Sequence, residues 1–139
     1  FGGNGAHTNF RESSLMRATI HPDKLAGYAS KSQADGYIGT CRAKLTGDNL
    51  FVAADVSENG SIQAAVCRPP SLHGPLSPID GYDFEQSTIE RHSNGHWRVR
   101  FEANKLSSLP KKPLLVVFKL RDAILYGYDG DIEPIRREI

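Results

Sequence analysis

The stretch that most constrains the fold is the apolar run from Leu114 to Tyr128, LLVVFKLRDAILYGY. Its first part, LLVVF, is rich in β-branched and aromatic residues, which favours a strand buried on both faces over a short helix. Arg121 and Asp122 interrupt the run with charge, and AILYGY resumes it with alternating large and small side chains. The pattern predicts two consecutive strands joined at a corner, or one long strand bent at Arg121–Asp122. In either form the run needs a second layer of structure to cover it.

The remaining chain contains short strand-like segments that can form this second layer. Apolar and polar side chains alternate over residues 14–20 and 37–45. The segment 49–68 predicts a hairpin with its turn at Asn59-Gly60, and the segment 88–102 predicts another with its turn at residues 93–95. No stretch has the period of an amphipathic helix.

The number and spacing of these segments predict the fold class. About eight strands with turn residues every 8–12 positions are typical of an all-β protein with two antiparallel sheets packed face to face. We expect a β-sandwich of the jelly-roll or concanavalin-like kind, with a closed barrel as the alternative. At 139 residues the chain is long enough for one domain. We expect a flexible lead-in over residues 1–13, the sandwich over 14–128 and a polar tail over 129–139.

Composition argues against several classes of function. Lys and Arg total 17 and Asp and Glu total 16, and they are scattered, so no basic stripe for nucleic acid is expected. No apolar run approaches the roughly 20 residues of a membrane helix. The sequence has no nucleophile elbow and no phosphate-binding glycine-rich loop, so we predict no catalytic residue, no metal and no cofactor.

Two features bear on the cellular compartment. Cys41 and Cys67 lie in separate strand-like segments. They could form a disulfide in an oxidising compartment, or remain two buried free thiols. Asn59-Gly60-Ser61 is a glycosylation sequon on a predicted turn, where an acceptor asparagine has to lie. Together they favour a secreted protein.

Two stretches, GDNLFVAADVSENGSIQAAV and SSLPKKPLLVVFKLRDAILYGY, resemble a known family. They are similar to the C-terminal β-sandwich module of five-bladed-propeller glycosidases of the glycoside hydrolase family 32 type and of related extracellular proteins. The resemblance runs from about Thr40 to Tyr128, and its most specific part is Leu120-Arg121-Asp122-Ala123 followed by Leu125-Tyr126. It implies an accessory module that packs against a catalytic propeller or, in some relatives, binds sugar. The propeller carries the catalytic carboxylates and is absent from this chain, so no catalysis is implied.

The proline-rich loop from Arg68 to Asp83 leads into the strongest candidate site. A sugar ring is held by an exposed aromatic platform with carboxylates or amides nearby. Tyr82 and Phe84 stand among acidic residues and supply that mixture. Trp97 is a further candidate platform, although it shares its face with Val99 and Phe101 and could instead belong to the core. The predicted carbohydrate-binding residues are Asp80, Tyr82, Asp83, Phe84, Glu85 and Trp97.

Other candidate sites are incomplete. His92 and His96 flank a predicted turn and could reach one metal ion, but two ligands do not complete a site. Asp129-Gly130-Asp131 resembles part of a calcium loop without its remaining ligands. Tyr126 and Tyr128 share the parity of Ile124, which predicts that they pack inside with their hydroxyls at the surface.

Sequence alone therefore predicts a non-catalytic module of an extracellular multidomain protein. The leading expectation is carbohydrate binding or an accessory role beside a neighbouring domain. The alternative is a structural module that mediates protein–protein contacts and has no sugar site.

Overall fold

The computed structural model describes residues 2–3, 13–14, 19–30, 34–70, 74–93 and 95–135. These residues form strands and three short 3-10 helices, and no α-helix occurs among them. The elements are β1 (Gly2–Gly3), β2 (Ser13–Ser14), η1 (Pro22–Lys24), β3 (Tyr28–Ala29), β4 (Gly36–Gly39), β5 (Ala43–Arg68), β6 (Ser77–Pro78), η2 (Phe84–Gln86), β7 (Ser87–Arg91), β8 (Trp97–Phe101), η3 (Leu106–Ser108) and β9 (Leu115–Pro134).

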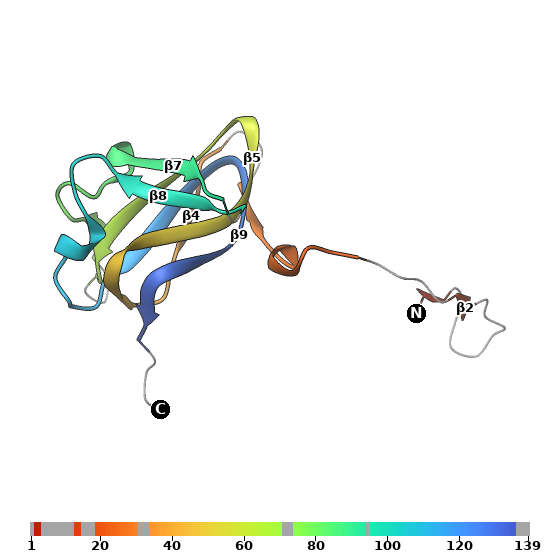
Figure 1. Ribbon diagram of the computed structural model, residues 1–139, viewed down its shortest axis with the longest axis horizontal. Helices are drawn as coiled ribbons and strands as arrows, with labels where there is room; N and C mark the ends of the chain where they lie inside the picture. The colour runs from red at the N-terminus through yellow and green to blue at the C-terminus, as the bar shows by residue number, and fades with distance from the viewer. Residues whose placement is uncertain are drawn as a thin grey trace.

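Two long strands, β5 and β9, organise the main sheet. They pair antiparallel from Ala43 opposite Pro134 to Cys67 opposite Leu115. The sheet has seven strands in the order β3-β9-β5-β8-β7, with β4 added to β9 and β6 added to β5. Figure 1 shows β5 and β9 running side by side and turning back together at one end of the molecule. The remaining strands therefore add to the edges of a β5–β9 ribbon.

The ribbon bends where residues 57–60 of β5 meet Asp122 of β9. The register shifts between Val56 and Ser61 at this point. Asp122 has a positive φ of 50°, a conformation that aspartate tolerates better than most residues. The Ser57 hydroxyl donates a hydrogen bond of 2.8 Å to the Asp122 carbonyl oxygen and ties the two sides of the corner. The run from Leu114 to Tyr128 is thus extended and bent at Arg121–Asp122, as one of the two sequence alternatives predicts.

The hairpin predicted over residues 49–68 is wrong. Both halves of this segment belong to β5, and each half pairs with β9 instead of with the other half. The Asn59-Gly60 turn signal marks the corner of a continuous strand. The second predicted hairpin is confirmed, because β7 pairs with β8 from Ser87 opposite Phe101 to Arg91 opposite Trp97, and Gly95 in its turn has a φ of 84°.

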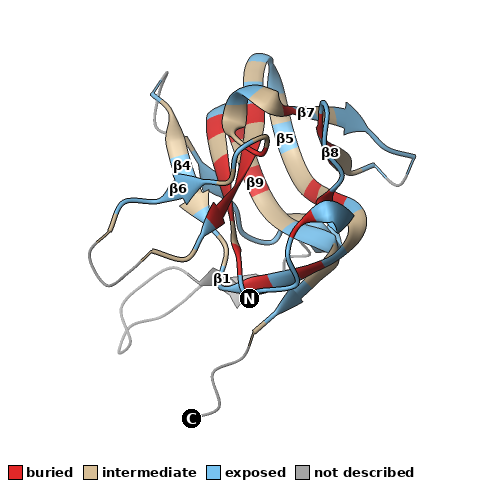
Figure 2. Cartoon of the chain, turned by 90° about the vertical axis from the view of Figure 1, so that its left-hand side faces the viewer, coloured by how far each residue is buried: buried red, intermediate tan, exposed pale blue. Residues whose placement is uncertain are grey.

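The bend folds the sheet over one hydrophobic core. Buried residues recur along both long strands (Figure 2), and the two halves of each strand contribute to one cluster that β8, η3 and Tyr82 complete. The core residues of the long strands are Leu45, Leu50, Val52, Ile62, Ala64, Val66, Val116, Phe118, Leu120, Ala123 and Leu125. The predicted all-β, antiparallel, sandwich-like class is confirmed. The two layers are parts of one continuous sheet, however, because the β5–β9 ladder continues around the corner.

The predicted domain ends need adjustment. The polar tail predicted over residues 129–139 is wrong as far as Pro134, since β9 continues to that residue and Leu45 pairs with Ile132. Residues 136–139 lie outside the described part of the chain. Most of the predicted lead-in over residues 1–13 and the interior of the strand predicted over 14–20 also lie outside it. Gly2–Gly3, in the predicted lead-in, pairs with Ser13–Ser14. Within the described ranges, no helix is long and apolar enough to cross a membrane.

Replacing Gly60 by alanine tests the corner. A Cβ atom at this position would lie 2.4 Å from the carbonyl oxygen of Asp122, and both positions are set by backbone. We expect Gly60→Ala to lower the free energy of unfolding by about 1–3 kcal/mol, the usual cost of overpacking, as measured by urea denaturation. The matched control is Gly39→Ala in β4, where the nearest atom to the new Cβ is 4.0 Å away. Equal losses in the two variants would contradict this account of the corner.

Candidate functional site

Tyr82, which the sequence placed in the sugar site, is buried in the core. The ring is only 6% exposed and packs against Phe101 with a centroid distance of 5.2 Å. Its hydroxyl donates a 2.7 Å hydrogen bond to the carbonyl oxygen of Lys105, and burial raises the pKa of the phenol, with a smaller contribution from Asp48. Tyr82 anchors the proline-rich loop to the core, so it cannot form a platform for a sugar ring.

Phe84 fixes the same loop on the other side of the sheet. It packs against a second, smaller cluster formed by Ala65, Cys67 and Val117, and its ring lies edge-on to Tyr37 at 5.7 Å. Of the predicted acidic neighbours, Asp80 and Glu85 are exposed and Asp83 is half-buried. The loop brings these five residues to one part of the chain, but it turns the ring of Tyr82 into the core and packs the half-buried ring of Phe84 against the second cluster.

Trp97 is half-buried and packs against the main core, as its parity with Val99 and Phe101 predicts. The indole Nε1 donates a 3.1 Å hydrogen bond to the carbonyl oxygen of Ala54. The Arg91 guanidinium lies 4.8 Å from the ring centroid. A ring packed on the core and stacked by an arginine has a structural role, which is the alternative that the parity of Trp97 with Val99 and Phe101 offered.

The incomplete metal candidates remain incomplete. Among the described residues no group of three or more His, Cys, Asp or Glu side chains could hold a metal ion. His92 stacks on Phe51 with a centroid distance of 4.9 Å, whereas His96 contacts Asp23 at 3.4 Å. Asp131 lies in β9 and accepts a 2.9 Å hydrogen bond from the Asn49 amide, so the predicted calcium-loop segment is an extended strand.

Cys41 and Cys67 are both free, so the structure does not contain the disulfide considered from sequence. Cys67 of β5 pairs with one edge of β9. On the other edge of β9, the amide of Thr40, which precedes Cys41, donates a hydrogen bond to the Val116 carbonyl oxygen. Two strand spacings amount to about 10 Å, and the Cα atoms of a disulfide lie within about 7 Å. Asn59 of the sequon is exposed at the corner of β5.

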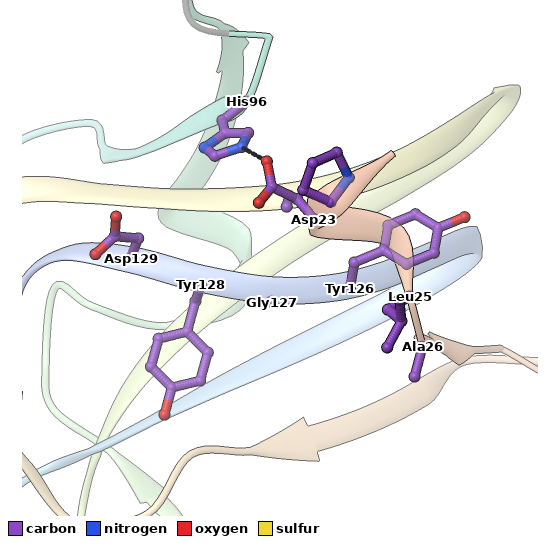
Figure 3. Close-up of a pocket in the computed structure, with 10 residues that line it drawn as sticks. Asp23, Leu25, Ala26, His96, Tyr126, Gly127, Tyr128 and Asp129 are labelled. Carbon is purple, nitrogen blue, oxygen red and sulfur yellow. Dashed lines mark hydrogen bonds and ion pairs between the residues drawn. The ribbon is translucent and has the colours of Figure 1, made fainter. Parts of the chain in front are cut away.

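A groove that the sequence did not predict lies on the outer face of the layer formed by β5 and β9. It has a volume of about 430 Å³ and runs beneath the segment 20–30, which we call the strap and which contains η1 and β3. Figure 3 shows Tyr126 beside the strap and Tyr128 projecting from β9 in the opposite direction. The groove is lined by Pro22, Asp23, Leu25, Ala26, Ala53, His96, Tyr126, Gly127, Tyr128 and Asp129.

Small residues form the floor of this strap groove. Ala53 and Gly127 are register partners on adjacent strands, and a Cβ atom at residue 127 would meet nothing within 4 Å. Ala123 and Leu125 face the core, so Ile124 and Tyr126 alternate to the outer face, and the Tyr126 ring lies outside instead of inside as predicted. The register shift between Ala53 and Ala54 leaves one extra residue on β9 and returns Tyr128 to the core face, opposite Val52. Tyr128, also predicted inside, keeps its ring 6.0 Å from core residue Phe118 but remains partly exposed.

Polar contacts hold the strap over the sheet. Asp55 on β5 pairs with Lys24 of η1 and accepts a 2.9 Å hydrogen bond from the Tyr126 hydroxyl. Asp23 contacts His96 of the hairpin, and the short strand β3 pairs with Leu125 and Ile124. The hydrogen bond from Lys24 and then that from Tyr126 lower the pKa of the Asp55 carboxyl. The site therefore combines an aromatic wall, carboxylates and an imidazole around an open floor.

The comparisons with known proteins add no assignment. No family model matches the chain, and no curated protein or solved structure matches it. The function has to be argued from the groove and from the sequence.

The anchoring role of Asp55 predicts a pH dependence. Because its pKa is lowered in the folded protein, its contribution to stability is fully present above the ordinary pKa of aspartate, about 4, and is lost as pH falls through the lower folded value. We expect Asp55→Asn to be less stable than wild type near pH 7 by under about 1 kcal/mol, since the pair is solvated. Urea denaturation at decreasing pH should show this difference shrinking as the pH falls below the ordinary pKa of aspartate and disappearing in strong acid. Asp80→Asn, at an exposed loop position, is the control, and a difference that persists into strong acid would contradict the role of Asp55.

Proposed function

We propose that the chain is a non-catalytic, carbohydrate-binding β-sandwich module of an extracellular multidomain protein, with its ligand in the strap groove. The observation that carries the proposal is the meeting of the Tyr126 ring with the carboxylates of Asp23 and Asp129 around an open floor at Gly127. Aromatic rings stack on the apolar faces of a sugar, and carboxylates accept hydrogen bonds from its hydroxyls. The groove supplies both kinds of group within about 430 Å³.

Binding without catalysis fits the electrostatics of this face. A glycosidase needs a carboxylic acid with a raised pKa to protonate the leaving group. Asp55, the carboxyl that anchors the strap beside the groove, has its pKa shifted in the opposite direction by Lys24 and Tyr126. A carboxylate that stays ionised is an acceptor for sugar hydroxyls and a poor general acid.

The resemblance of residues 40–128 to glycosidase-associated sandwich modules supports attachment to a larger protein. A single shallow groove binds one or two sugar units weakly, and its occupancy rises when other domains hold the same polymer. The exposed sequon at Asn59 lies at the corner of β5 and is compatible with an extracellular location.

The alternative is a module that binds a protein and has no sugar site. It is favoured by the apolar side chains that the strap segment exposes: Leu25 is 77% exposed, Tyr28 is 67% exposed and the preceding Ile20 is 58% exposed. Exposed apolar residues that cluster on one short segment are typical of contact surfaces. This alternative predicts that Leu25→Ser and Tyr28→Ser abolish partner binding, whereas blocking the groove floor has no effect.

Filling the floor of the groove tests the sugar proposal directly. Gly127 requires no positive φ and has open space above it, so Gly127→Leu should fold normally while its side chain occupies the groove. On a glycan array and in calorimetry of the best ligand, we expect affinity to fall by at least about tenfold. Gly39→Leu is the matched control, because Gly39 is also a strand glycine with room for a side chain but lies on β4.

Two outcomes would overturn the proposal. If the wild-type domain binds no glycan at high concentration, carbohydrate recognition is excluded. If Gly127→Leu binds as well as Gly39→Leu, the ligand lies elsewhere. Unchanged thermal unfolding of both variants would show that any loss comes from the blocked groove.

A further inference from the structure

A second pocket of about 310 Å³ lies at the other end of the same layer, beside the loop that leads into η3. We call it the Arg98 pocket. Its lining residues are Asp48, Arg98, Val99, Arg100, Phe101, Asn104, Lys105 and Leu106. It shares no lining residue with the strap groove and is not part of the proposed sugar site.

Strand register places Arg98 on the same face of the sheet as the strap groove. Asp129 of β9 lies opposite Phe51 of β5, and Phe51 lies opposite Arg98 of β8. Directly paired residues project from the same face of a sheet. Asp129, at the edge of the groove, and Arg98 are therefore two strand spacings apart, about 10 Å. A ligand that extends across the strands from the groove reaches the Arg98 pocket.

The charge of the Arg98 pocket is positive. Arg98, Arg100 and Lys105 face one carboxylate, Asp48. Asp48 already accepts a 2.7 Å hydrogen bond from the Ser107 amide. The hydrogen bonds from Ser107 lower the pKa of Asp48 most, and the charges of Lys105 and Arg98 lower it further, which places both cations within electrostatic reach of the carboxylate. Arg100 forms an ion pair with Glu90 at 2.8 Å, so the excess positive charge of the pocket comes from Arg98 and Lys105.

Arg98 is held in place but incompletely satisfied. Its Nη2 donates a 3.0 Å hydrogen bond to the side-chain oxygen of Asn49. Its Nε is buried and has no hydrogen-bond partner among the described residues. A buried guanidinium donor without an acceptor costs free energy, and such groups in native proteins are commonly completed by water or by an ion. The side chain is thus oriented in advance by Asn49 and retains capacity to bind an anion.

We infer that the Arg98 pocket is a subsite for an anionic substituent, a carboxylate or a sulfate, on a glycan that extends from the strap groove. This inference rests on the proposed function and narrows its ligand to an acidic polysaccharide. Arg98 makes the charge-assisted hydrogen bonds, and Lys105 adds a second positive charge at the rim. Asp48 opposes the anion and sets a limit on its affinity.

Inorganic sulfate tests the anion subsite separately from the groove. Sulfate added to the labelled protein should shift the NMR signals of the Arg98 side chain and of Lys105, with saturation. Arg98→Gln should weaken this binding about tenfold, the usual effect of losing a charge-assisted hydrogen bond. Lys105→Gln, at an exposed position, should weaken it by about two- to fivefold. Asp48→Asn keeps the acceptor for the Ser107 amide and removes the opposing charge, so it should tighten binding by about two- to fivefold.

Arg68→Gln in β5 is the matched control and should bind sulfate like wild type. A protein whose Arg98 signals do not move, or whose sulfate affinity is the same in all variants, would overturn the anion subsite. This result would leave neutral-sugar binding in the strap groove untouched.

The glycan arm compares oligosaccharides of equal length with and without uronate or sulfate groups. We expect the acidic ligands to bind more tightly to wild type, Arg98→Gln to erase this preference, and Gly127→Leu to weaken both kinds of ligand. Sulfate binding without any preference among the oligosaccharides would overturn the acidic-glycan assignment. If the wild-type domain binds sulfate but none of the oligosaccharides, the result would instead contradict the proposed sugar groove.

Discussion

The antiparallel pairing of β5 with β9 is the interaction on which the rest of the structure depends. The ladder continues around the corner at residues 57–60 and Asp122, so hydrogen bonds connect the two layers as well as stabilising each one. Because strand side chains alternate, one face of this ribbon closes on the core and the other face remains outside on both layers. The outer face of one layer holds the strap and both proposed binding sites, and that of the other is covered by Phe84.

Sequence periodicity predicted the strands well because it is a local property. The alternation around Leu50 and Ile62 defines strand segments with one buried face. The apolar run after Leu114 defines one that is buried on both, with Phe118 in the main core and Val117 in the smaller cluster. Pairing is a different matter. The Asn59-Gly60 signal is the same whether the chain reverses into a hairpin or turns a corner, and only the presence of a long partner strand decides between them. Asp122 at positive φ supplies this partner with a matching bend.

The binding face was harder to predict than the fold. Tyr82 and Phe84 stand beside acids in a loop without periodicity, so nothing in the sequence tells whether their rings point inward. Tyr126 shares the parity of Ile124, and the sequence alone does not tell that this parity faces outward while Leu125 faces the core. The one-residue bulge that reverses the parity before Tyr128 is visible only in the register with Ala53 and Ala54. The strap is short, mixes polar and apolar residues, and carries no strand or helix pattern. Arg98 lies between Trp97 and Val99 in the sequence, and strand alternation predicts only that it is on the opposite face from them. Its pocket also needs Leu106 of η3, which lies outside this strand pattern.

Small residues beneath the strap leave room for a groove on the face of the sheet. A Cβ atom at Gly27 would lie 2.8 Å from the side chains of Ile124 and Tyr126, so the strap approaches β9 as closely as backbone allows. Farther along β9 and on the adjacent strand β5, Gly127 and Ala53 leave open space that larger side chains would fill. The strap buries no residue of η1 and depends on polar contacts with Asp55 and His96. Segments held in this way open at a lower free energy than the core strands, and a ligand that contacts strap and floor together would stabilise the closed arrangement by mass action.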